Sequence, residues 1–126
     1  QGKKIGEFSL KMAPPTFTPG PGNTIAVQAN FEGPVTGEMA GLHRGTLSVV
    51  AVPGAKSGTW TQYGMATMKD GTILGFRAQG IWEWESGAGT GHYRGTGQLS
   101  DGTTYATEFE VKWAMQSWAG KIYEWS

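Results

Sequence analysis

The sequence predicts an all-β fold, an eight-stranded antiparallel β-barrel, from three observations. Glycine supplies 21 of the 126 residues, about 17% against roughly 7% in an average protein. Aromatic residues reach 12%, which is too many for a disordered chain. Several runs alternate apolar and polar residues, whereas no stretch has a helical period of useful length. Closure into a barrel removes the exposed edges of a small sheet, and a β-sandwich is the alternative.

Eight strands follow from this alternation along one domain, residues 1–126. They are expected at Lys4–Met12, Thr24–Phe31, Arg44–Val52, Thr59–Met68, Thr72–Glu85, Gly91–Leu99, Thr103–Trp113 and Gly120–Trp125. The segment 13–23 contains four prolines and is expected to be a loop, because proline removes a backbone donor from a strand or helix. Phe17 in this loop either caps a barrel mouth or covers the core.

Two Asp-Gly-Thr segments, 70–72 and 101–103, give the clearest β-hairpin signals in the sequence. Asp-Gly suits a two-residue turn or a three-residue loop that ends in a left-handed glycine. Counting from three-residue loops places aromatic rings opposite glycines, which stabilises a strand pair. The pairs are Phe76 with Gly64, Trp60 with Gly80, Trp82 with Gly58 and Tyr105 with Gly97. The same count pairs Arg94 with Glu108, His92 with Glu110 and Tyr93 with Phe109, so we predict three-residue loops.

Charge and composition exclude several classes of function. Lys plus Arg and Asp plus Glu each number 10, and this balance argues against a nucleic-acid or membrane partner. The chain has no cysteine, hence no disulfide or thiolate chemistry. Neither His43 nor His92 lies in a metal-binding spacing, and the group His92, Glu108 and Glu110 is interpreted as solvated ion pairs. We expect no metal and no cofactor.

No nucleotide-binding, nucleophile or targeting motif stands out in the sequence. Residues 87–91 (GAGTG) lack the lysine of a phosphate loop and are expected to be a barrel corner. A Gly-x-Ser-x-Gly nucleophile motif is missing, and the longest apolar run is too short for a membrane span. Gln1 is not an initiator methionine, which is compatible with a leader or tag already removed; the cytoplasm is the default location.

The apolar face of the strands supplies one candidate site. Trp60, Phe76, Trp82 and Phe109 share this face. They either form a solid core or line a cavity for an apolar ligand, because an eight-stranded barrel is just wide enough to hold one. We predict that these four residues contact a hydrophobic small molecule.

The opposite face carries Tyr63, Arg77 and Glu83. If it points inward, Arg77 polarises an oxygen, Glu83 moves a proton and Tyr63 orients the substrate. If it points outward, it needs no function. The two faces line the same wall only if a bulge switches them between Arg77 and Trp82.

A family resemblance rests on residues 80–97 (GIWEWESGAGTGHYRGTG). This stretch resembles a pattern of the allene oxide cyclase-like barrel superfamily, above all its small uncharacterised bacterial members. Segments 31–37 and 57–59 are similar in order and spacing, and the resemblance covers about residues 29–103. It implies an eight-stranded, often oligomeric barrel, with relatives that include cyclases and stereochemical guides acting on apolar molecules. The acidic residues of the cyclases have no matching motif here.

Two classes of function follow, together with a purely structural barrel. The leading hypothesis is a cofactor-independent cyclase, isomerase or lyase that holds a hydrophobic molecule in a productive shape and adds one acid or base. The alternative is a binding or guiding module without turnover. A titratable residue inside the cavity would discriminate between them. Low charge and abundant aromatic residues also predict a homo-oligomer.

Overall fold

The structure, a computed structural model, is all-β and describes residues 2–85 and 90–125. Residues 86–89, with most of the predicted corner at 87–91, lie outside the described part. The elements are β1 (Lys4–Met12), β2 (Thr16–Pro19), β3 (Ile25–Gly37), β4 (Gly41–Ala51), β5 (Ser57–Met68), β6 (Ile73–Glu85), β7 (Thr90–Leu99), β8 (Thr104–Lys112), the 3-10 turn η1 (Trp113–Met115) and β9 (Ser117–Glu124).

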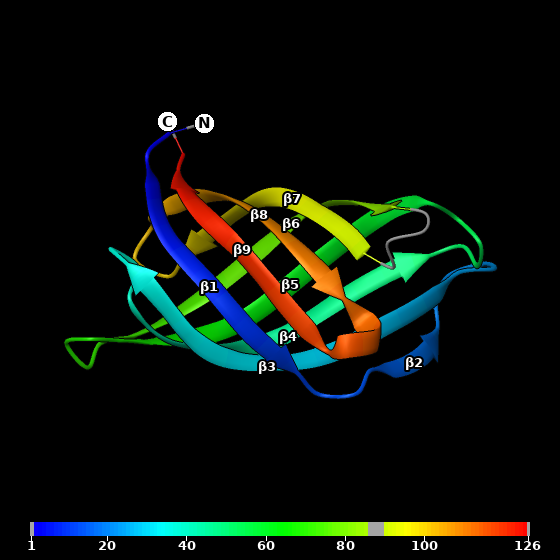
Figure 1. Cartoon of the computed structure of the whole chain (residues 1–126), viewed down its shortest axis with the longest axis horizontal. Coiled ribbons are helices and arrows are strands. Elements are labelled where there is room, and N and C mark those ends of the chain that lie inside the picture. Colours follow the sequence, from blue (N-terminus) through cyan, green and yellow to red (C-terminus); the bar gives the residue numbers. More distant parts are fainter. Residues whose placement is uncertain (1, 86–89, 126) are drawn as a thin grey trace.

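The strands form a closed antiparallel barrel (Figure 1). Their order is β1-β9-β8-β7-β6-β5-β4-β3-β2, and pairing of β1 with β3 closes eight strands into a barrel that leaves β2 outside the ring. The predicted fold class is therefore confirmed. In the described ranges no helix has the length and apolar character to cross a membrane.

Both Asp-Gly-Thr segments form the predicted three-residue loops. The Met68 N–H donates to the Thr72 carbonyl at 2.8 Å, and the Leu99 N–H donates to the Thr103 carbonyl at 2.8 Å. Gly71 has a φ of +89°, a left-handed value that favours glycine. The carboxylate of Asp70 accepts the Thr72 N–H at 2.9 Å, and this backbone hydrogen bond lowers the pKa of Asp70.

The strand register predicted from these loops is correct at every pair named above. The glycines lie under the rings as expected, because a Cβ built at Gly97 would fall on the ring of Tyr105, 2.6 Å from Cε2. At Gly64 the same atom would meet the ring of Phe76. These glycines let large rings lie flat against the inner wall.

The apolar faces point inward and fill the barrel with stacked rings. Phe109 stacks on Tyr93 at a centroid distance of 5.0 Å and on Trp118 at 4.8 Å. Trp118 in turn contacts Phe31 at 4.3 Å. This chain of rings runs across the interior from β7 to β3.

Four strands correct the prediction, two of them only near their ends, because β4 begins at Gly41 and not at Arg44, and β9 begins at Ser117 and not at Gly120. Part of segment 13–23, predicted to be a loop, forms β2; it is an edge strand bonded to β3 alone, where Pro19 at its end is tolerated. β3 runs on past Phe31, its predicted end, through Pro34. Pro34 keeps its pair with Leu42 in β4. The ladder between β1 and β3 has pairs at Glu32 and Val35 but none at Pro34, so the missing N–H of this proline interrupts only the pairing with β1.

Candidate functional site

An open cleft lies at the end of the barrel where β2 approaches the last residues of β6. Its volume is about 520 Å³, within the range of roughly 300–1,000 Å³ of ligand pockets. Most of the lining is aromatic or aliphatic. The lining residues are Pro15, Phe17, Val27, Val49, Ala51, Gly54, Ala55, Lys56, Trp82, Trp84, Tyr93 and Trp113. We call this feature the aromatic cleft.

The cleft has a buried floor and an exposed rim. Trp82 on β6 is only 6% exposed, whereas Trp84, two residues further along the same strand, is 39% exposed. Phe17 on β2 is 65% exposed and pairs with Val27, which pairs with Val49. β2 therefore extends the inner wall of the barrel beyond its closed part.

Tyr93 and Trp113 close one side of the cleft. The indole of Trp113 lies beside the hydroxyl of Tyr93. Burial raises the pKa of Tyr93 to about 12, and Trp113 opposes this only in part. The phenol therefore keeps its proton at neutral pH and offers a neutral hydroxyl.

The loop between β4 and β5 brings the one charged residue to the cleft lining. Pro53 and Gly54 occupy the centre of a turn that the Ala55 N–H closes by donating to the Val52 carbonyl at 2.9 Å. Gly54 has a φ of +86°, as a type II turn requires. The backbone N–H of Trp84 donates to the carbonyl of Lys56 at 2.8 Å, which ties the loop to β6.

The four predicted ligand-contacting rings belong to the core. Trp60, Phe76, Trp82 and Phe109 are all buried, and Trp82 alone of the four also lines the aromatic cleft. Trp60 is 1% exposed, and its Nε1 donates to the carbonyls of Ile81 and Arg94 at 3.0 and 3.3 Å. All four belong to the packed core cluster, and the ligand contact expected of them stays a prediction.

A small cavity remains among the core side chains. Its volume is about 30 Å³, which is room for about one or two water molecules. Buried His43, whose Nε2 lies 3.1 Å from the Met39 carbonyl oxygen, lines it together with Gln62 and Trp118. The Oε1 of Gln62 and the Nε1 of Trp118 are buried without a hydrogen-bond partner in the described part. Burial lowers the pKa of His43.

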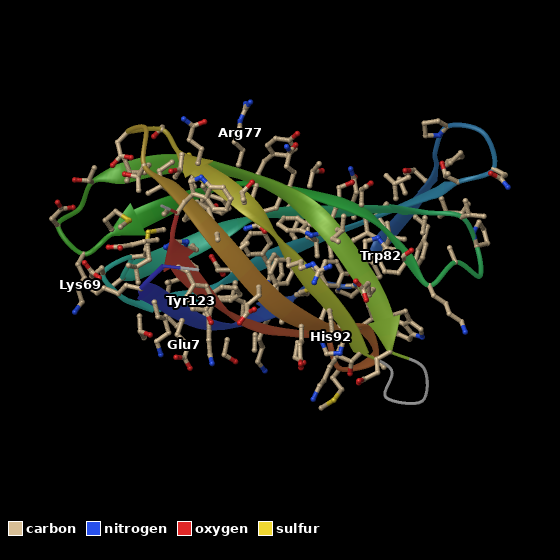
Figure 2. All side chains as sticks on the ribbon, turned by 90° about the horizontal axis from the view of Figure 1, so that it is seen from above. Glu7, Lys69, Arg77, Trp82, His92 and Tyr123 are labelled. Carbon is tan, nitrogen blue, oxygen red and sulfur yellow. The ribbon has the colours of Figure 1, made fainter. Side chains whose placement is uncertain are left out.

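Tyr63, Arg77 and Glu83 lie on the outer face of the barrel. Figure 2 shows Arg77 pointing away from the sheet, and its Cζ lies 5.8 Å from the ring centroid of Tyr63. Glu83 accepts a hydrogen bond from Arg94 at 3.4 Å. Since β6 pairs with β7 in unbroken register, no bulge turns this face inward. The trio therefore shares no interior pocket with the apolar rings, and the inward geometry that its catalytic roles require is not formed.

Charged residues near His92 form ion pairs on the same outer surface. The Nδ1 of His92 lies 3.4 Å from a carboxylate oxygen of Glu110, and its Nε2 lies 3.5 Å from one of Glu85. Arg94 is opposite Glu108 in the register but forms its ion pair with Glu83. Over residues 2–85 and 90–125, no group of three or more His, Asp or Glu side chains is arranged to hold a metal ion.

Sequence reasoning missed Trp84 and Lys56 as cleft residues. Trp84 has a usable signal, because residues two apart in a strand share a face and Trp82 lies on the apolar face. Trp113 also has one, because the alternation of its strand places it on the apolar face, although it was not among the four predicted ligand contacts. Lys56 has none, since the β4–β5 loop meets β6 only through the folded barrel. Comparisons with protein-family models, curated proteins and solved structures gave no match to this chain.

Proposed function

We propose that this barrel binds a hydrophobic small molecule in the aromatic cleft, without turnover. The observation that carries the proposal is the exposure of Phe17 and Trp84 on the rim of a cleft of about 520 Å³. A ligand seated between them removes apolar ring surface from water at roughly 25 cal/mol per Å². The cleft is also concave and largely preformed, as small-molecule sites usually are.

The groups that line the cleft support binding over catalysis. Its titratable side chains are Tyr93, which keeps its proton because burial raises its pKa to about 12, and Lys56. Tyr63, Arg77 and Glu83, the expected catalytic residues, do not line it. The resemblance of residues 80–97 to allene oxide cyclase-like barrels supports an apolar ligand, because relatives in that superfamily act on apolar molecules. We retain membership of that superfamily as a proposal.

Binding of a neutral fluorescent probe, N-phenyl-1-naphthylamine, tests the proposal. We expect saturable enhancement of probe fluorescence with one site per chain. Trp84→Ala is expected to weaken binding about tenfold, since exposed aromatic anchors dominate binding energy. Trp125→Ala is the matched control, because Trp125 is also exposed but lines an outer groove with Tyr63 and Arg77. Absence of saturable binding, or equal weakening in both variants, would overturn the proposal.

A further inference from the structure

Lys56 gives the aromatic cleft a positive charge that no other lining residue neutralises. It is the one formally charged residue among those that line the cleft, and no carboxylate lines it. Lys3 and Lys4, by comparison, pair with Glu38 and Glu7 at 3.0 and 2.7 Å. No ion pair within 4.0 Å involves Lys56 over the described ranges.

The backbone of Lys56 is held in a fixed place beside the rim. The type II turn before it and the hydrogen bond from the Trp84 N–H to its carbonyl at 2.8 Å fix the residue next to β6. Lys56 is exposed and lines the cleft, and its flexible stem lets the ammonium reach the solvent side of the cleft. Buried Trp82 and Tyr93 form the opposite, apolar side.

This arrangement separates an apolar floor from a cationic rim. A purely apolar ligand uses the floor and leaves the ammonium unpaired, and a cationic ligand is repelled by it. A ligand with a hydrophobic body and one carboxylate uses both parts, because an ammonium forms a charge-assisted hydrogen bond to a carboxylate. We infer that the aromatic cleft takes an amphipathic anion, a hydrophobic carboxylate whose acid group pairs with Lys56. This inference rests on the proposed function of the cleft.

Three ligands of nearly equal shape test the inference in the intact chain. They are 1-naphthaleneacetate, its neutral amide 1-naphthaleneacetamide, and the cationic 2-(1-naphthyl)ethylamine, with affinities measured by isothermal titration calorimetry. We expect the anion to bind about two- to fivefold more tightly than the amide, as a partly solvated ion pair allows. The amine should bind most weakly. Added salt should reduce the advantage of the anion, because an exposed pair is screened.

Two substitutions of Lys56 test whether this residue causes the preference for the anion over the amide. Lys56→Gln should abolish the advantage of the anion over the amide, whereas Lys56→Arg should keep it. Lys69→Gln is the matched control, because it removes the same charge at the end of the barrel away from Trp82 (Figure 2). We expect Lys69→Gln to bind all three ligands as the wild type does.

The outcomes separate this inference from the proposed function. Equal binding of the anion and the amide to the wild type would overturn the inference and leave the cleft as a neutral apolar site. Loss of the preference in Lys69→Gln as well would also overturn it, because the effect would then come from overall charge. No binding of any of the three ligands, or of the neutral naphthylamine probe, would overturn both.

Discussion

Replacing Gly97 by alanine is expected to place a methyl group against a buried aromatic ring. Gly97 on β7 lies opposite Tyr105 on β8, and the added Cβ would approach ring atom Cε2 to 2.6 Å. Tyr105 is buried, so its ring must shift within the barrel wall to admit the methyl group. Overpacking of this kind costs about 1–3 kcal/mol, which outweighs the gain of about 0.4–1 kcal/mol from a stiffer unfolded chain.

Urea unfolding followed by tryptophan fluorescence measures this effect. We expect Gly97→Ala to lose about 1–2 kcal/mol of unfolding free energy with an unchanged denaturant slope. Gly75→Ala is the matched control on the outer face of β6, because a Cβ there meets no atom closer than 3.9 Å. It should be as stable as the wild type or slightly more stable. Equal stability of Gly97→Ala and Gly75→Ala would refute the account of rings covering glycines.

Three further predictions concern the core, the pH response and assembly. Gln62→Leu should raise the unfolding free energy by about 1 kcal/mol, because the unpaired buried Oε1 is removed; destabilisation in urea unfolding would show that the amide has a partner. Burial holds the pKa of His43 below 6.5 in the folded state, so the unfolded chain protonates first and stability falls as the pH drops below 6.5. This slope should persist in His92→Gln and flatten in His43→Gln, and thermal unfolding across that range measures it. We expect the homo-oligomer predicted from the sequence to sediment with a mass above 13.5 kDa. Met65→Glu on the exposed outer face should favour the monomer. A wild-type mass of 13.5 kDa would contradict the prediction of an oligomer.

Local chemistry made the hairpins and the strand faces predictable. Asp70 and Gly71 favour a loop of two or three residues, and the pairing of rings with glycines selects three. That loop then determines which residues oppose each other along β5 and β6 for their whole length. Pairs far from the loop, such as Trp82 with Gly58, were therefore correct. The extent of β3 was not predicted, because only the folded barrel shows that Pro34 keeps its pair with β4 and interrupts the ladder to β1 alone.

The candidate site was harder to predict because it depends on packing between distant segments. Residue parity placed Trp60 and Phe109 inside, but whether inward rings fill a barrel or leave a cavity depends on how their volumes fit together. Here Phe109 stacks between Tyr93 and Trp118 and fills the interior. The cleft forms instead from β2, the β4–β5 loop, β6 and η1, whose proximity no local pattern encodes.

A titration of the tryptophan indole N–H signals with 1-naphthaleneacetate tests the central claim most directly. The six tryptophans report on separate regions: the aromatic cleft, the packed core and the outer groove. They are Trp82, Trp84 and Trp113 in the cleft, Trp60 and Trp118 in the core, and Trp125 in the groove. We expect saturable chemical-shift changes concentrated at Trp84 and Trp113, with Trp60 and Trp125 unmoved. Changes centred on Trp60 and Trp118, or on Trp125, would place the ligand elsewhere and contradict the account.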